Sequence, residues 1–134
     1  MTSTNEMSKK ILVTNALPYA NNSIHIGHLV GYIQADIWVR YQKMKERDCL
    51  YLCASDSHGT PIMLSAEAIG LEPEALAEQY TKEHSKDFQD FLIEFDNYHS
   101  THTTENETLV GEIFNQLNKS GHIEKKIIEQ SYDK

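Results

Sequence analysis

The chain has 134 residues, and 20 acidic against 12 basic side chains give it a formal net charge of -8 at pH 7. This length suits one domain with a core of its own and leaves no room for a second domain of normal size. The negative charge repels phosphate backbones, which argues against a broad nucleic-acid-binding surface but leaves a specific nucleotide pocket open.

The sequence carries no signal for export or for a membrane. It has no window of eighteen apolar residues, and residues 1–10 are polar, unlike a signal peptide. We therefore expect a soluble, cytoplasmic protein whose residues 1–8 are a disordered polar amino terminus. Cys49 and Cys53, the only cysteines, lie in an apolar run and are expected to be buried reduced thiols, with a metal or disulfide role as the lesser alternative.

The first half of the chain predicts two strands and a helix. Residues 11–15 are a short apolar run ended by turn formers, and 50–54 are a second such run, so both indicate strands. Residues 18–23 are loop. From His28 to about Glu46, apolar side chains recur every three or four residues, which predicts a helix packing one face onto a sheet. The stripe consists of Val30, Ile33, Ile37, Tyr41 and Met44.

Two further helices are predicted next. Pro61 is tolerated in a first helical turn and Gly70 is a typical C-cap, so residues 62–69 form a short helix. Residues 74–95 are predicted to form a long surface helix with one apolar stripe. That stripe consists of Leu76, Tyr80, His84, Phe88, Phe91 and Phe95.

The last third predicts a strand, a helix and another strand. Residues 98–102 are a candidate short strand. Thr104 with Glu107 forms a capping-box pattern before an apolar helical stretch that Gly121 closes. Residues 123–132 are predicted to be a last strand or hairpin arm. The apolar side chains of the helix before Gly121 are Leu109, Val110, Ile113, Phe114 and Leu117.

Strands that alternate with helices indicate an α/β fold, a Rossmann-like parallel sheet with flanking helices. In such sheets ligands bind at the carboxyl ends of the strands. The loops that leave the first two strands, residues 15–28 and 55–61, are therefore expected to hold the chemistry.

The first loop ends in His25-Ile26-Gly27-His28, with the second histidine near the start of a helix. Free N–H groups and the helix dipole favour an anion there, so a phosphate is the natural ligand. Histidine donates a directed hydrogen bond without a permanent charge, and donors aimed at developing negative charge are each worth on the order of 3 kcal/mol. Gly27 lets a base or ribose approach the backbone. The alternative is two loop histidines with surface contacts only, but the strand before, the helix after and the glycine within favour function.

The second loop contains one carboxylate, Asp56, which is expected to face the same crevice. It is suited to pair with a ligand ammonium or to hold ribose hydroxyls. The alternative is a turn or cap residue ahead of a helix. Thr60 is interpreted as a cap, Gly59 as a turn residue, and the role of His58 is open.

At these residues the chain resembles the class I aminoacyl-tRNA synthetases. The His25–His28 signature resembles theirs, and the lead-in at residues 16–21 resembles the methionine-specific members. The likeness continues through residues 33–41, 56–63 and 96–102 and runs from about Lys9 to Asp133. The resemblance implies that residues 9–134 are the amino-terminal half of a Rossmann-fold catalytic domain.

The resemblance implies an ATP-dependent reaction in two steps, adenylation of methionine and its transfer to tRNA. ATP would be used with Mg²⁺. His25 and His28 would be catalytic, binding the triphosphate and stabilising the transition state, and Asp56 would hold the substrate ammonium. The implied ATP-binding residues are Asn21, His25, Gly27 and His28, and the implied methionine-binding residues are Ala16, Leu17, Tyr19 and Asp56.

The chain is shorter than this family's enzymes, which continue through a zinc-binding insertion, the second half of the nucleotide fold, a Lys-Met-Ser-Lys-Ser loop and an anticodon-binding domain. We therefore expect an amino-terminal fragment with little turnover alone, no metal site of its own, zinc only in the downstream insertion, and tRNA contacts outside this chain. Two alternatives stay open, a non-catalytic ATP- or methionine-binding module and a small nucleotidyltransferase with the same histidine signature.

Overall fold

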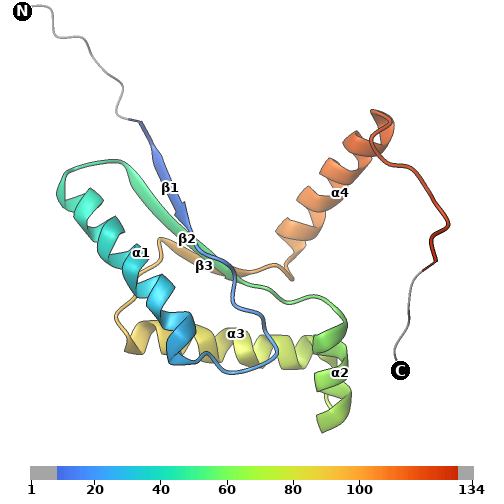
Figure 1. Cartoon of the computed structure of the whole chain (residues 1–134), viewed down its shortest axis with the longest axis horizontal. Coiled ribbons are helices and arrows are strands. Elements are labelled where there is room, and N and C mark those ends of the chain that lie inside the picture. Colours follow the sequence, from blue (N-terminus) through green and yellow to red (C-terminus); the bar gives the residue numbers. More distant parts are fainter. Residues whose placement is uncertain (1–8, 130–134) are drawn as a thin grey trace, which may run out of the picture. The chain divides into compact units, whose positions relative to one another are not determined.

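The structure, a computed structural model, describes residues 9–129 and contains a three-stranded parallel sheet in the order β1-β2-β3 (Figure 1). The α/β class expected from the sequence is thus confirmed. The chain divides into two compact units, one ending at His102 and the other beginning at Thr103. The elements are β1 (Ile11–Thr14), α1 (Ile26–Met44), β2 (Cys49–Ser55), α2 (Thr60–Ile69), α3 (Pro73–Asp90), β3 (Asn97–Ser100) and α4 (Thr104–Lys119).

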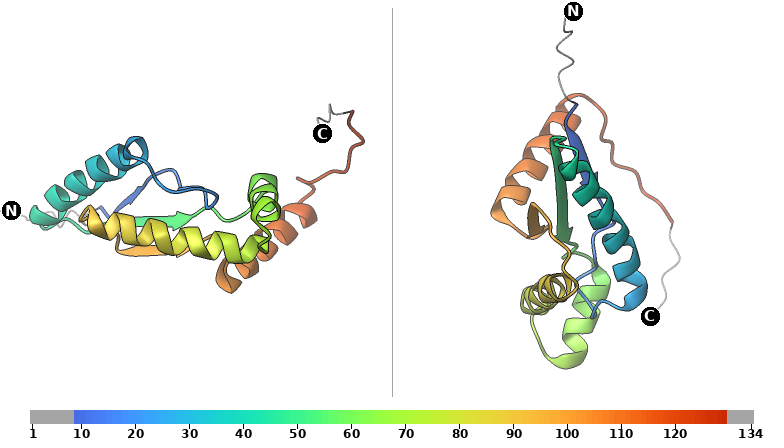
Figure 2. Two further views of the ribbon diagram at one scale, coloured as in Figure 1. Left: turned by 90° about the horizontal axis from the view of Figure 1, so that it is seen from below. Right: turned by 90° about the vertical axis from the view of Figure 1, so that its left-hand side faces the viewer.

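The core of the first unit lies on one face of the sheet. The alternating residues of β2 that point to this face are Cys49, Tyr51 and Cys53, and all are buried against α1 and the end of α3. A second small cluster joins α2 to α3, which pack against each other beyond the carboxyl end of β2 (Figures 1 and 2). No helix in the described part of the chain has both the length and the apolar character needed to cross a membrane.

The predicted apolar face of α1 is wrong. Its buried residues are Leu29, Tyr32, Asp36, Val39 and Gln42, two of them polar. Of the expected stripe, Ile33 is partly buried against the core, whereas the other four residues are 49–81% exposed. The buried polar residues are satisfied by hydrogen bonds, because Asp36 accepts from Arg40 Nε and the Glu94 N–H, and Gln42 accepts from Arg47. A count of apolar side chains cannot detect such a face.

Helix α3 ends earlier than predicted. It stops at Asp90, and Leu92 takes a positive φ of 58° that turns the chain back toward the core. The Ile93 N–H then donates to the Phe88 carbonyl at 2.9 Å. Phe95 reaches the core from this loop, where its ring lies 5.1 Å from that of Phe88. Its spacing from Phe88 imitates the helical period, which explains the overextended prediction.

The second unit contains α4, none of whose residues is buried. Its N-cap is Thr103 rather than the predicted Thr104, since the Asn106 N–H donates to Thr103 Oγ1 at 3.2 Å. Gly121 follows the helix with a φ of 74°, as expected. The predicted last strand is wrong over residues 123–129, which form no strand and have no strand partner among the described residues. The rest of that prediction, and the prediction for residues 1–8, lie outside the described residues.

Candidate functional site

The loops that follow β1 and β2 meet, as the sheet prediction requires. Tyr19 and Asp56 form an isolated parallel bridge. The Asp56 N–H donates to the Pro18 carbonyl and the Ala20 N–H donates to the Asp56 carbonyl, both at 2.8 Å. This bridge extends the β1–β2 pairing beyond the sheet and places the predicted carboxylate beside the loop that leads to the histidines.

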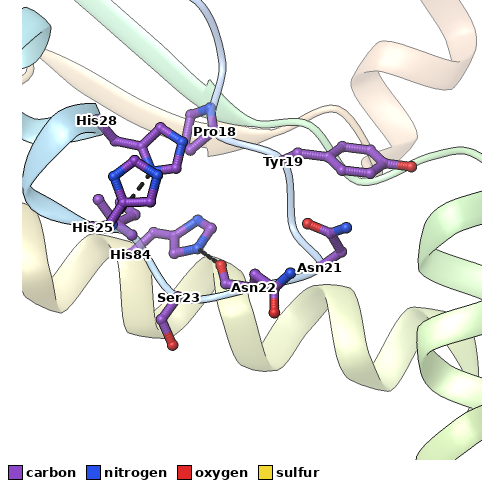
Figure 3. Close-up of a pocket in the computed structure, with 9 residues that line it drawn as sticks. Pro18, Tyr19, Asn21, Asn22, Ser23, His25, His28 and His84 are labelled. Atoms are coloured by element: carbon purple, nitrogen blue, oxygen red, sulfur yellow. Dashed lines mark hydrogen bonds between the residues drawn. The ribbon is translucent and has the colours of Figure 1, made fainter.

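A pocket of about 440 Å³ lies between this loop, the start of α1 and α3; we call it the histidine pocket (Figure 3). Four of the predicted site residues line it, namely Tyr19, Asn21, His25 and His28. Ala16, Leu17 and Gly27 are close to these residues in sequence, and Asp56 is bridged to Tyr19, but none of the four lines the pocket. The full lining is Pro18, Tyr19, Asn21, Asn22, Ser23, Ile24, His25, His28 and His84.

The two signature histidines occupy defined places at the start of α1. His25 is the N-cap residue and His28 is the third residue of the helix. Their rings are stacked, with centroids 3.7 Å apart and planes inclined by 20°. The His25 N–H donates to His28 Nδ1 at 3.3 Å. Because Nδ1 accepts, the proton of the neutral His28 ring is on Nε2, which leaves that N–H as a directed donor.

The electrostatic surroundings favour the neutral form of His28. Desolvation of the ring and the nearby imidazoles of His25 and His84 lower the pKa of His28 below its usual value of 6.5. The free N–H groups of the first turn of α1 add a positive field at the same place. His28 can therefore donate a hydrogen bond to an anion without carrying a permanent positive charge.

Gly27 leaves space for the His25 ring. A Cβ built on Gly27 would lie 3.1 Å from both Cε1 and Nδ1 of His25, which is closer than an ordinary contact. An alanine here would require the His25 ring to shift by a few tenths of an ångström. The glycine thus preserves the geometry of the pair, in addition to any close approach of a ligand.

The start of the loop is held from the core by three hydrogen bonds. The Tyr32 hydroxyl donates to the Ala16 carbonyl at 2.5 Å, and the Tyr51 hydroxyl donates to Asn15 Oδ1 at 2.6 Å. Asn15 Nδ2 in turn donates to the Gly31 carbonyl at 3.3 Å. These bonds fix the backbone of the predicted methionine-binding segment, where Ala16 and Leu17 remain exposed to solvent.

The second loop supports the first through Gly59. Its φ is 117°, and a Cβ there would lie 2.7 Å from the hydroxyl oxygen of Tyr19. Gly59 is also the N-cap of α2, so the predicted capping role of Thr60 is wrong; Thr60 is the first helical residue. Asp56 is not a cap either. Its carboxylate has no hydrogen-bond or ion-pair partner in residues 9–129, which leaves it available to a ligand.

The remaining polar residues of this region divide between structure and site. His58 Nε2 donates to the Thr101 carbonyl at 3.3 Å, and its ring lies 5.2 Å from that of His102, so it packs at the end of β3 and not in the histidine pocket. Both cysteines are free and buried in β2, as expected, and burial raises the pKa of the Cys53 thiol to about 11. No group of three or more His, Cys, Asp or Glu side chains among the described residues could hold a metal ion.

His84 lines the histidine pocket, and sequence reasoning placed it only in an apolar stripe. It lies on α3, is 1% exposed, and bonds through Nε2 to the Asn22 carbonyl at 2.7 Å. Figure 3 shows its ring beside those of His25 and His28. The available signal was a single imidazole among otherwise apolar stripe positions, which does not by itself distinguish a site residue from a core histidine.

Comparisons with known sequences identify the family of the chain. The family described as "tRNA synthetases class I (M)" matches residues 11–134. A methionine--tRNA ligase from Francisella tularensis subsp. holarctica (strain OSU18) is 56% identical over 125 residues. That match covers 93% of this chain and 18% of the relative. The chain thus spans about a fifth of the length of the curated relatives it matches.

Solved structures share the fold. Mycobacterium tuberculosis methionyl-tRNA synthetase bound by methionyl-adenylate superposes with a TM-score of 0.81 at 26% identity, covering 84% of this chain and 22% of that one. A LeuRS from Agrobacterium radiobacter K84, in a ternary complex with tRNA and LeuAMS, gives a TM-score of 0.80. Its identity is 22% over 87% of this chain and 15% of that one, so this likeness concerns the fold alone. The family match over almost the whole chain establishes that it belongs to the class I tRNA synthetases of the M group.

Proposed function

We propose that this chain supplies the ATP-binding and methionine-binding loops of a methionine--tRNA ligase. In that reaction the methionine carboxylate attacks the α-phosphorus of ATP, the bond to the β-phosphate oxygen breaks, and pyrophosphate leaves. The terminal ribose hydroxyl of tRNA then takes the methionyl group from the adenylate and releases AMP.

The buried thiols of Cys49 and Cys53 suit the reducing cytoplasm, where we place the protein.

The observation that carries the proposal is the fixed donor pair at the start of α1. Negative charge grows on the phosphate oxygens as the new bond forms, and His28 Nε2–H with the His25 imidazole would meet it there. Preorganised donors of this kind stabilise the transition state more than the ground state. A neutral His28 fits this role because it binds the resting triphosphate less tightly than a cation would.

The methionine side of the site rests on Asp56 and the loop after β1. The free carboxylate would pair with the substrate ammonium, while Ala16, Leu17 and Tyr19 would offer apolar contacts to a polarisable thioether. Mg²⁺ would arrive with ATP on its phosphates. Zinc and tRNA would be bound by parts of the relatives that lie beyond this segment, and the isolated chain is expected to bind substrates with little turnover.

A chimera tests the proposal directly. Residues 9–134 would replace the matching segment of the Francisella ligase, which is feasible at 56% identity over 125 residues. We expect methionine-dependent exchange of pyrophosphate into ATP by the chimera. Exchange driven by another amino acid and not by methionine would overturn the proposal.

Substitutions in the chimera separate the roles of the residues. His25→Ala and His28→Ala should each lower kcat by about 100-fold with much smaller changes in the KM for ATP, because the donors act in the transition state. Asp56→Asn should raise the KM for methionine by about tenfold and leave that for ATP unchanged. His122→Ala, an exposed histidine outside every element, is the matched control. An equal loss in kcat and ATP binding for the histidine variants would assign them a plain binding role.

A further inference from the structure

His84 has one satisfied and one unsatisfied ring nitrogen. A carbonyl oxygen can only accept, so the 2.7 Å contact to Asn22 requires the proton on Nε2. Nδ1 of the neutral ring is then a bare acceptor, and it is buried without a hydrogen-bond partner in the described part of the chain. An apolar side chain of similar size would fill this place without burying an unpaired polar atom. Packing alone therefore does not account for a histidine here.

The His84–Asn22 hydrogen bond reaches the stretch of the loop between β1 and α1 that has the fewest other anchors. Before it, Ala20 is fully buried and bonded to Asp56, and after it, His25 is fixed as the N-cap of α1. Residues 21–24 lie between these two anchors and line the histidine pocket. Among residues 9–129, His84 is the one side chain that hydrogen-bonds to the backbone of that stretch.

The position of His84 links this stretch to the signature pair. Its ring is close enough to contribute to the lowered pKa of His28, and Figure 3 shows the three imidazoles together on one side of the pocket. Tyr80 lies one turn earlier on the same stripe, with its ring centroid 6.0 Å from that of His84, and has no hydrogen bond to the loop within residues 9–129. Among the described residues, α3 thus holds residues 21–24 through this one hydrogen bond, whereas its contact with Ala20 is apolar.

We propose that His84 is a positioning residue of the nucleotide site, whose Nε2–H holds the Asn22 carbonyl so that Asn21 and His25 keep their places around the nucleotide. This inference rests on the proposed function for its catalytic consequence. Without the bond, ATP still meets the start of α1, but the donors are less well aligned when charge develops. The loss should therefore fall on kcat more than on the KM for ATP.

Two substitutions separate positioning from packing. His84→Gln keeps an N–H donor near the position of Nε2, whereas His84→Met fills a similar volume without a donor. Tyr80→Phe is the matched control, since it changes a polar group on the same stripe that does not bond to the loop. In the chimera, His84→Met should lower kcat about tenfold with the KM for ATP changed less than about threefold, and His84→Gln should restore most of the rate.

Nuclear magnetic resonance of the 134-residue chain gives a readout independent of activity. With ¹⁵N-labelled histidine, His84 should show a protonated Nε2. The amide resonances of residues 22–25 should move in His84→Met and stay near their original positions in His84→Gln.

An unprotonated Nε2, or loop resonances that move equally in both variants, would overturn the positioning role, as would a His84→Met chimera with unchanged kcat. If the unsubstituted chimera lacks methionine-dependent exchange, the proposed function fails, and the spectra still decide whether His84 holds the loop.

Discussion

At the residue scale, a single backbone hydrogen bond decides what His28 offers a ligand. The His25 N–H occupies Nδ1 of His28, so Nε2–H is the nitrogen left to face an incoming phosphate. The sequence predicted the two histidines and their place at a helix start, because a strand, a glycine and an apolar helical period surround them. It did not predict the tautomer, which depends on the φ and ψ angles of the His25 N-cap.

His28 should titrate below the ordinary histidine value. Burial and the imidazoles of His25 and His84 lower its pKa below 6.5 in the folded chain, whereas in the unfolded chain these causes are absent and the pKa stays at 6.5. The unfolded chain then binds more protons just below pH 6.5, so the stability contribution is complete above that pH and is lost as the pH falls toward the lowered pKa. Proton resonance of the His28 ring against pH measures this directly. His25→Ala should move the midpoint upward, and a midpoint at or above 6.5 in the unsubstituted chain would contradict the assignment.

Gly59 should tolerate no side chain. Its φ of 117° strains any other residue, and a Cβ would lie 2.7 Å from the Tyr19 hydroxyl oxygen. Gly59→Ala should cost about 1–3 kcal/mol of unfolding free energy and displace the Tyr19 ring. Gly31→Ala is the control, because its Cβ would meet Asn15 at an ordinary 3.7 Å and its position is helical. Denaturant unfolding compares the two, and equal stability of both variants would show that the loop adapts.

At the element scale, α1 is tied to the segment after α3 by charged groups. Arg40 bonds to Asp36 within α1 and to the Leu92 carbonyl, while Lys43 bonds to Asp96 at 2.7 Å. Asp96 also accepts from the Tyr51 N–H at 2.7 Å, which joins the helix to the central strand. Asp36, Arg40 and Asp96 lie in stretches that resemble the family, and in the structure they hold α1, the segment after α3 and β2 together.

Asp96→Asn should weaken this connection. Burial alone would raise the pKa of Asp96, but the bonds from Lys43 and the Tyr51 N–H hold it below its usual 3.8. We expect a loss of about 1–2 kcal/mol in unfolding free energy near pH 7, limited because Lys43 is partly solvated. In the unsubstituted chain, the contribution of Asp96 to the free energy of unfolding should disappear as the pH falls below about 4 toward the lowered pKa.

The exposed pair Lys86 and Asp90 provides the control for this measurement. Asp90→Asn should change the denaturation midpoint little, because the pair is solvated on both sides. If Asp90→Asn and Asp96→Asn destabilise the chain equally, Asp96 does not fasten α1 to the sheet.

Local patterns predicted where the helices and strands occur better than how they pack. The apolar runs at β1 and β2 were sufficient to locate these strands, and the glycines after α2 and α4 were sufficient to locate the ends of these helices, because such signals act over a few residues. The buried face of α1 was not predictable from apolar spacing, since Asp36 and Gln42 are satisfied by partners far away or beyond the helix end. The contact of His84 with the loop was not predictable for the same reason, because its partner Asn22 lies 62 residues earlier in the chain.

At the scale of the whole molecule, the first unit leaves apolar surface uncovered. The face of the sheet opposite the core carries Leu12, 64% exposed, paired in register with Leu50, 47% exposed. Strand β1 pairs with β2 along one edge and with no strand of residues 9–129 along the other, so that backbone edge is also free. Exposed edges and contiguous apolar patches favour association between chains.

The isolated chain should therefore self-associate through this face. Light scattering or sedimentation at increasing concentration should show a rising average mass, and Leu12→Lys should reduce it by placing a charge in the middle of the patch without disturbing the core. Ile11→Lys is the contrasting variant, because Ile11 packs against the core and its replacement should instead lower the denaturation midpoint. The chimera, in which the remainder of the ligase is present, should stay at a defined mass. A monomer of the isolated chain over a wide concentration range would mean that the exposed leucines and the β1 edge are not sufficient to drive association.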